Sequence, residues 1–254
     1  MGWDSDIDDA PDGALRDQPP DLLSPIDPRA PVGGHFPSPV TSTIHDTPEH
    51  DWSVAATLVV PMLRPPGSHG TRLADVDQEQ LAREGLRGHA LPVIDDGPEG
   101  LNVAYAIRAG GFDVLVNADH LLEWRIEPET LRSTAMGNLA TWSAAIPWVE
   151  EAEGARRLLS SDSGEGSDAT RILLPQVRAD LLTRLGGEGR VLVGLPERHL
   201  LVAGTLRGDD LEFATLFADF VRARAEGADE PIDRRLFEIV RGDLVAFYPL
   251  RPDA

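Results

Sequence analysis

The sequence contains no cysteine, and this absence excludes several kinds of site at once. Disulfides, thiolate zinc sites, iron–sulfur clusters and cysteine nucleophiles all need a thiol. Lysine is absent as well, so all 23 basic residues are arginines, and neither Schiff-base chemistry nor a P-loop lysine is available. A chain without cysteine is typical of a reducing compartment, and we expect a cytoplasmic location.

Long apolar runs are also missing. The longest strongly apolar stretch, residues 54–63, is interrupted by Pro61 and is much shorter than the ~20 residues that cross a bilayer. The first six residues have neither the basic nor the apolar segment of a secretory signal. We therefore expect no membrane partner and no secretory signal.

Positive charge is scarce. The chain has 43 acidic residues against 23 basic ones, which gives a formal net charge of −20. Such a field repels polyanions, and the arginines form no cluster in the sequence, so we expect no nucleic acid as partner. A protein partner is compatible with this charge.

The chain divides into two parts of unlike composition. Residues 1–50 are rich in Asp and Pro and lack apolar periodicity, which is typical of a disordered acidic tail. Residues 51–254 are predicted to form one α+β domain, with two subdomains split near residues 150–165 as the alternative.

Apolar patterns predict the main elements of that domain. Strands are expected where short apolar runs stand between turn residues, namely at residues 54–60, 89–94, 101–108, 112–117, 156–160, 190–195, 200–205, 236–240 and 244–248. Helices are expected at residues 77–84 and 119–124, after Pro128 and Pro175, and at residues 209–224. Hairpins followed by helices indicate an α+β fold with a mostly antiparallel sheet and at least three packed amphipathic helices.

The helix predicted at residues 209–224 has the clearest apolar stripe. Its apolar residues recur at three- and four-residue spacing, and they are Phe213, Leu216, Phe217, Phe220 and Val221. We expect its aromatic residues, Phe213, Phe217 and Phe220, in the core.

Several sequence blocks in this order resemble the YtpQ-like family, a bacterial domain family of unknown function (number 1444). The blocks are residues 101–105, 117–124 with 135–139, 168–175 and 193–201. The resemblance covers about residues 52–254. The family's proline-containing corner usually has Asp where His199 stands here. The resemblance implies a family but no activity, substrate or cofactor.

The best candidate site combines two polar segments. It consists of Asp168, Arg171, Glu197, Arg198 and His199. Arginine can clamp a carboxylate or phosphate, histidine can carry a proton, and a carboxylate can orient it. The structural alternative is that Asp168 caps a helix while Arg198 holds the corner in an ion pair.

Other polar segments are weaker candidates. Residues 162–168 lack the spacing of a calcium or phosphate loop, and residues 45–50 offer metal-ligand types without a rigid frame. Residues 117–120 pair His with Asp, but a helix cap explains them equally well. Trp124, Trp142 and Trp148 are expected in the core rather than in a groove. No motif indicates a cofactor, a resident metal or a serine nucleophile.

Two functional hypotheses follow. The first is a non-catalytic intracellular binding or regulatory module that works through a surface groove or the acidic tail. The alternative is a small hydrolase for an anionic substrate, in which Arg171 and Arg198 clamp while His199 or Asp168 transfers protons. The alternative requires these side chains to share an open pocket.

Overall fold

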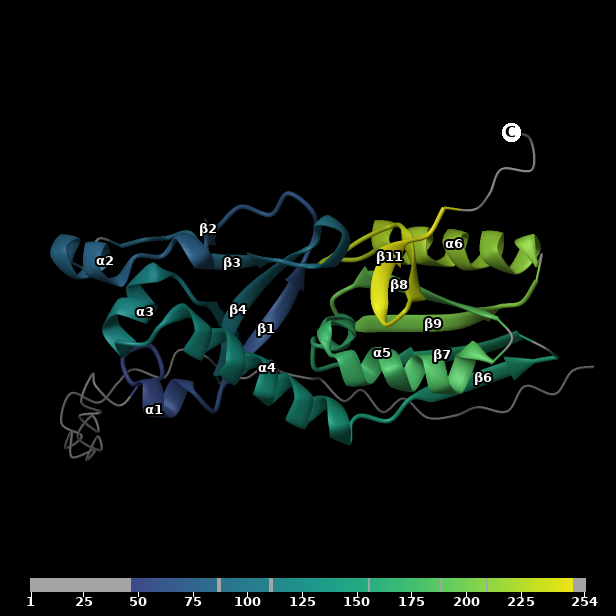
Figure 1. Cartoon of the computed structure of the whole chain (residues 1–254), viewed down its shortest axis with the longest axis horizontal. Coiled ribbons are helices and arrows are strands. Elements are labelled where there is room, and N and C mark those ends of the chain that lie inside the picture. The colour runs from purple at the N-terminus through teal and green to yellow at the C-terminus, as the bar shows by residue number, and fades with distance from the viewer. Residues whose placement is uncertain are drawn as a thin grey trace, which may run out of the picture. The chain divides into compact units, whose positions relative to one another are not determined.

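The computed structural model describes residues 47–85, 88–109, 112–154, 156–187, 189–208 and 210–248 (Figure 1). Within them, helices pack against two sheets whose strands are almost all antiparallel, which confirms the predicted α+β class. The predicted tail, residues 1–50, lies outside the described residues except for residues 47–50. These four contact the folded part, because the Pro48 carbonyl accepts a 3.0 Å hydrogen bond from Trp124 Nε1.

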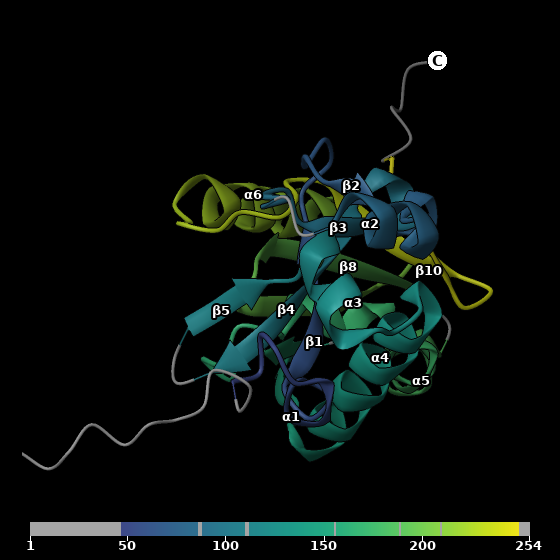
Figure 2. The same cartoon turned by 90° about the vertical axis from the view of Figure 1, so that its left-hand side faces the viewer.

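The first sheet has the strand order β1-β4-β3-β2, with β5 paired to β4 (Figure 2). Its strands are β1 (Val59–Arg64), β2 (Thr71–Arg72), β3 (Val93–Asp96), β4 (Asn102–Ala109) and β5 (Phe112–Leu115). The predicted hairpin is confirmed, since Ala106 pairs with Leu115 and Ala109 with Phe112. Its turn residues 110–111 lie outside the described ranges.

Two strand predictions in this sheet are partly wrong. The apolar run at residues 54–60 was expected to be a strand throughout, but α1 (Trp52–Ala55) and a turn occupy its first part. The cause is local, because the Asp51 carboxylate accepts the Ser53 backbone N–H at 2.8 Å and so starts a helical turn. The strand predicted at residues 89–94 begins only at Val93 and continues to Asp96.

The second sheet has the order β11-β10-β8-β9-β7-β6, and its neighbouring strands pair antiparallel. Its strands are β6 (Val149–Glu153), β7 (Arg156–Ser161), β8 (Arg190–Glu197), β9 (Leu200–Leu206), β10 (Leu236–Val240) and β11 (Asp243–Ala246). The sequence pattern did not predict β6. This edge strand is exposed along its whole length, so it shows no alternation of buried and exposed residues.

The predicted helices are present with small shifts at their ends. They are α2 (Gln78–Glu84), α3 (Ala118–Trp124), α4 (Pro128–Ala145), α5 (Pro175–Leu181) and α6 (Leu211–Glu226). A 3₁₀ helix, η4 (Ala169–Leu173), precedes α5, and a π-helical turn, η5 (Leu182–Gly186), follows it. Asp77 and Asp210 cap α2 and α6 through their side chains.

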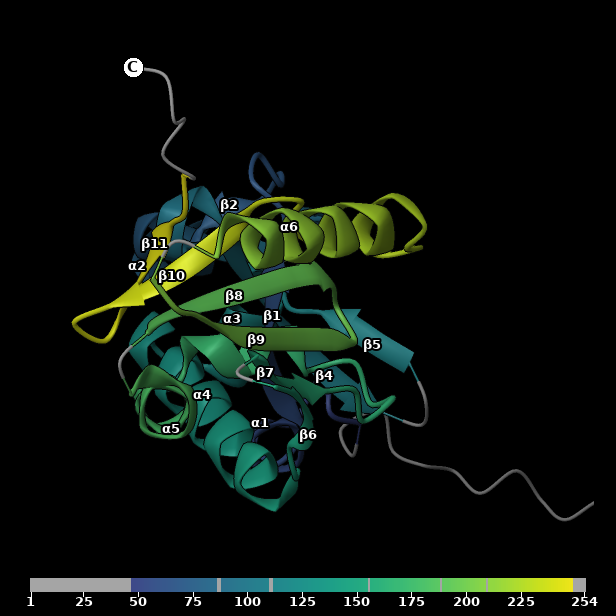
Figure 3. The same ribbon diagram turned by 90° about the vertical axis from the view of Figure 1, so that its right-hand side faces the viewer.

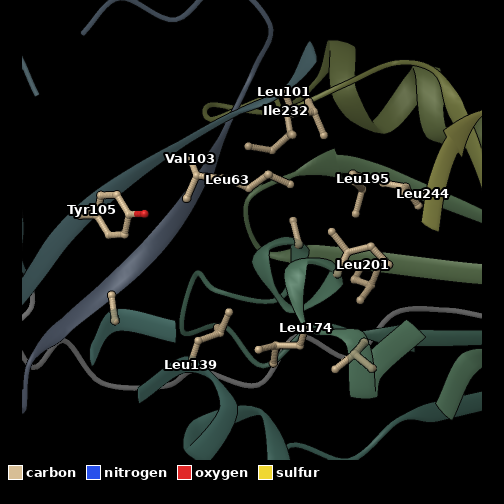
Figure 4. Close-up of a cluster of buried hydrophobic side chains, with 14 of the residues drawn as sticks. Leu63, Leu101, Val103, Tyr105, Leu139, Leu174, Leu195, Leu201, Ile232 and Leu244 are labelled. Atoms are coloured by element: carbon tan, nitrogen blue, oxygen red, sulfur yellow. The ribbon is translucent and has the colours of Figure 1, made fainter. Parts of the chain in front are cut away.

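The main core draws side chains from both sheets (Figure 4). Leu63 and Tyr105 of the first sheet belong to the same buried cluster as Leu195 and Leu201 of the second. Each large apolar side chain buried in this way contributes roughly 1.5–3 kcal/mol. The alternative of two subdomains would place a boundary near residues 150–165, in the β6–β7 hairpin. Residues before and after this hairpin contribute to the same core.

The second sheet is also apolar on its other face, where α6 packs (Figure 3). Two glycines allow the close approach. A Cβ at Gly194 would lie 2.3 Å from Val221 Cγ2, and one at Gly204 would lie 2.8 Å from Phe213 Cζ. Because Gly194 is in β8 and Gly204 in β9, α6 covers these two strands.

The apolar stripe of α6 is wider than this contact requires. Phe213 and Phe217 are buried as predicted and Val221 is buried too, but Leu216 is 55% exposed and Phe220 is 45% exposed. The prediction that the aromatic residues of this helix belong to the core is therefore wrong for Phe220.

Candidate functional site

Asp168 is fully buried just before η4. Its carboxylate accepts hydrogen bonds from the hydroxyls of Ser161, at the end of β7, and Ser163, the latter at 2.7 Å. The side chain makes no capping bond to η4, so that alternative is wrong for Asp168. The two serines instead hold the loop after β7 against the start of η4.

Arg171 is buried in the same region, with 3% of its surface exposed. Its guanidinium donates to Ser143 Oγ at 2.9 Å, to Ser161 Oγ at 2.5 Å, and to the carbonyls of Ser143 and Ile146. It also lies 4.3 Å from the centre of the Trp148 ring. Burial lowers the pKa of Arg171, while the nearby Asp168 carboxylate opposes this shift. Nearly all its donors are engaged, so Arg171 ties α4 to β7 and η4.

Arg198 occupies the turn between β8 and β9 and connects three segments. It donates to the Gly166 carbonyl at 2.7 Å and forms ion pairs with Asp113 of β5 and, at 3.2 Å, with Glu230. Its own carbonyl accepts the Ala169 N–H at 3.2 Å. The two polar segments of the candidate site therefore meet in space, and Arg198 holds the corner in ion pairs as the structural alternative predicted.

The other two candidate residues point elsewhere. Glu197 pairs with Arg224 of α6 at 2.6 Å, and His199 Nε2 lies 4.0 Å from Glu230 Oε2 with 44% of its side chain exposed. Of the five candidates, Asp168 and Arg171 are buried, and Arg198 connects three segments. Glu197 and His199 have other neighbours, Arg224 and Glu230. The five candidates do not line one open pocket, because Asp168 and Arg171 are enclosed while His199 faces solvent.

The weaker candidates also have structural partners. Asn117 and His120 form a capping box at the start of α3: His120 N–H donates to Asn117 Oδ1, and Asn117 N–H donates to His120 Nδ1, both at 3.1 Å. Asp119 binds the ring and backbone N–H of His89. Burial lowers the pKa of His120.

The three tryptophans differ from one another. Trp124 is buried beside Trp52, as predicted. Trp142 and Trp148 are half-buried, and their indole N–H groups donate to Glu165 at 2.5 Å and to Asp180 at 2.8 Å. Of the metal-ligand segment at residues 45–50, residues 45 and 46 lie outside the described ranges, and His50 lies 3.7 Å from Glu123.

A large cavity lies elsewhere, beside α6. We call it the α6 groove; it measures about 680 Å³ and lies between α6 and the outer face of β6 and β7. Its apolar lining comes from both sides and comprises Val149, Leu158, Leu200, Val202, Phe213, Leu216, Phe217 and Phe220. The exposed Leu216 and Phe220 form one wall, and Val149, 58% exposed, belongs to the opposite wall.

The charged lining of the α6 groove is uneven. Arg156 is paired with Asp210 and Glu212, and Arg224 is paired with Glu197. Glu151, Glu153 and Asp162 also line the groove, and no ion pair or hydrogen bond joins their side chains to another described residue. The groove therefore combines apolar walls with an excess of unpaired carboxylates.

Two signals in the sequence could have indicated this groove. The α6 stripe contains two more large apolar residues than one sheet contact buries. The acidic composition of β6, Val-Glu-Glu-Ala-Glu, is typical of a protected edge strand. Neither signal shows from the sequence alone that α6 and β6 border the same cavity.

A second cavity, of about 590 Å³, lies between the end of α4 and α5. Arg171 and Trp148 line it, together with Asp180 and Arg184, which pair at 2.9 Å. Its charged side chains thus already bind one another or the backbone.

No known protein family, curated protein or solved structure matches the chain. Among the described residues, no helix has the length and apolar character needed to cross a bilayer, and no three histidine or carboxylate side chains are grouped to hold a metal. The geometry of the α6 groove and of the polar clusters is therefore the basis for inferring a function.

Proposed function

We propose that this chain is a non-catalytic binding module that binds a partner protein through the α6 groove. The observation that carries this proposal is the exposure of Leu216 and Phe220 beside a cavity of about 680 Å³. Large apolar side chains gathered at a concave surface mark interaction sites more often than isolated exposed ones do.

The polar clusters support the same conclusion. Arg171 and Asp168 are enclosed, and the guanidinium of Arg198 binds Gly166, Asp113 and Glu230. A substrate anion would have to displace these contacts. The hydrolase alternative therefore gains no support from the described residues.

Charge substitutions in the groove test the proposal. Leu216→Asp and Phe220→Asp place a carboxylate where the partner's apolar residues would contact α6. Phe112→Asp is the matched control, because Phe112 is 76% exposed on β5 in the first sheet. Proteins captured from native lysate by the wild type are expected to be lost with both groove variants and kept with the control.

Unchanged thermal unfolding would show that the groove variants remain folded. Capture of the same proteins by the wild type and both groove variants would contradict the proposal. A chain lacking residues 1–46 separates the groove from the acidic tail, since partners of the tail are lost only with that deletion.

Location and family complete the proposal. We propose a cytoplasmic location on the absence of cysteine, and cell fractionation tests it. Membership of the YtpQ-like family stays a prediction, because it depends on the order of short sequence blocks.

A further inference from the structure

The outer face of the second sheet is only partly covered. The strand order ends in β9-β7-β6, and α6 covers β8 and β9 through the contacts at Gly194 and Gly204. Neighbouring strands are about 4.8 Å apart and a helix with its side chains is about 10–12 Å wide, so one helix covers roughly two strands. α6 also contacts β7, through Leu158 and Arg156. The rest of the outer face of β7 and β6 borders the α6 groove and leaves room for one more helix beside α6.

The surfaces that this helix would contact are apolar on two sides. Leu158 of β7 lines the floor, and Leu216, Phe217 and Phe220 of α6 line the wall. An amphipathic helix with apolar residues at i, i+3, i+4 and i+7 presents a stripe that fits such a corner.

The third side, β6, determines the charge of the occupant. Val149, Glu151 and Glu153 alternate along β6 and line the groove, and Asp162 lies beyond the end of β7. Because the two arginines of the lining are paired within the chain, the groove keeps an excess of negative charge. Basic residues flanking the apolar stripe would complement it.

From these observations, and resting on the proposed function, we propose that the occupant of the α6 groove is a basic amphipathic helix of a partner protein.

Other occupants fit less well. A second copy of the chain would bring the same acidic β6 against Glu151 and Glu153. The first 46 residues of the chain are acidic as well, with only Arg16 and Arg29 as basic residues. A partner strand paired with the free edge of β6 would lie beyond β6, on the side away from β7 and α6. It would therefore leave Leu216 and Phe220 exposed.

A designed peptide tests the proposal directly. The probe is an 18-residue fluorescent helix of Leu, Ala and Lys with leucines at i, i+3, i+4 and i+7, and binding to the full chain is followed by anisotropy. Its twin carries Glu in place of Lys, and a third version carries two central prolines that prevent a helix. We expect binding of the Lys peptide only, with a gain of helical circular dichroism.

Three variants of the chain locate the bound peptide. Phe220→Ser is expected to weaken binding about tenfold or more, as the loss of a buried aromatic anchor does. Glu151→Gln with Glu153→Gln is expected to weaken it a few-fold at low salt and to reduce its salt dependence. Val245→Ser on β11, 39% exposed, is the matched control and is expected to change nothing.

Each contrary result has a defined meaning. No binding of the Lys peptide, equal binding of the Glu peptide, binding of the proline peptide, or no effect of Phe220→Ser would each overturn the proposal. A dimer in sedimentation velocity that Phe220→Ser abolishes would also overturn it and identify a second copy as the occupant. If groove variants lose lysate partners that the Lys peptide fails to displace, the proposed function stands and only the helix is wrong.

Discussion

Replacing Arg171 with Met tests whether the best polar cluster of the sequence is structural. The substitution keeps most of the side-chain length but removes the charge and the hydrogen bonds to Ser143 and Ser161. It also removes a positive charge that acts on the buried carboxylate of Asp168, to which Arg171 is linked through Ser161. Each buried polar group left without its charged partner costs about 1–3 kcal/mol, and we expect a loss of about 2–5 kcal/mol.

The assay is equilibrium unfolding in urea, followed by circular dichroism and by tryptophan fluorescence. Arg184→Met is the matched control, because Arg184 pairs with Asp180 at the surface and its side chain is 46% exposed. Exposed pairs contribute about 0–1 kcal/mol, so the control is expected to change stability little.

A second substitution separates the charge from the packing. In the double variant Arg171→Met with Asp168→Asn, position 168 no longer carries a charge, so we expect its stability loss to be smaller than the sum of the single losses by about 1–2 kcal/mol. A loss below about 1 kcal/mol for Arg171→Met, or strict additivity, would refute the structural role of the pair.

Two further predictions concern packing and pH. Gly194→Ala is expected to destabilise the fold by about 1–3 kcal/mol because its Cβ meets Val221, whereas Gly137→Ala, in open space on α4, should stabilise it by about 0.5–1 kcal/mol in the same unfolding assay. Burial lowers the folded-state pKa of His120 below its usual 6.5, so unfolding takes up a proton there and stability should fall as the pH drops below about 6.5. Because Gln can accept the same capping bond from Asn117, His120→Gln should keep stability at pH 7 and show a smaller loss at pH 5; equal pH profiles would contradict this.

The fold was largely predictable because most elements have local signals. Pro128 and Pro175 begin α4 and α5, and Arg241-Gly242 forms the turn between β10 and β11. The strand predictions were wrong where a helix cap opposed the strand pattern of the residues, or where a strand has no buried face. At residues 54–58, the Asp51 cap started a helix in a run that reads as a strand, and β6 has no buried face to mark it.

The candidate site was predictable only in its composition. Asp168 and Arg171 stand in a polar segment that reads as an exposed loop, yet both are buried, and Arg171 binds Ser143, 28 residues away in the sequence. Sequence spacing gives no measure of burial, because Ser143 on α4 reaches Arg171 only through the packing of α4 against η4. A polar motif therefore identified a structural junction.

The α6 groove is the reverse case, in which residues with an apolar core pattern line the candidate site. Its residues are common core types, and the sequence pattern assigned Phe220 to the interior. Leu216 and Phe220 are exposed because the sheet face beside α6 continues across β7 to β6 and the α6 groove lies between them. An apolar stripe wider than its intramolecular contact leaves surface for a second contact. In this chain, the excess apolar residues of one helix locate the candidate site better than its polar motifs do.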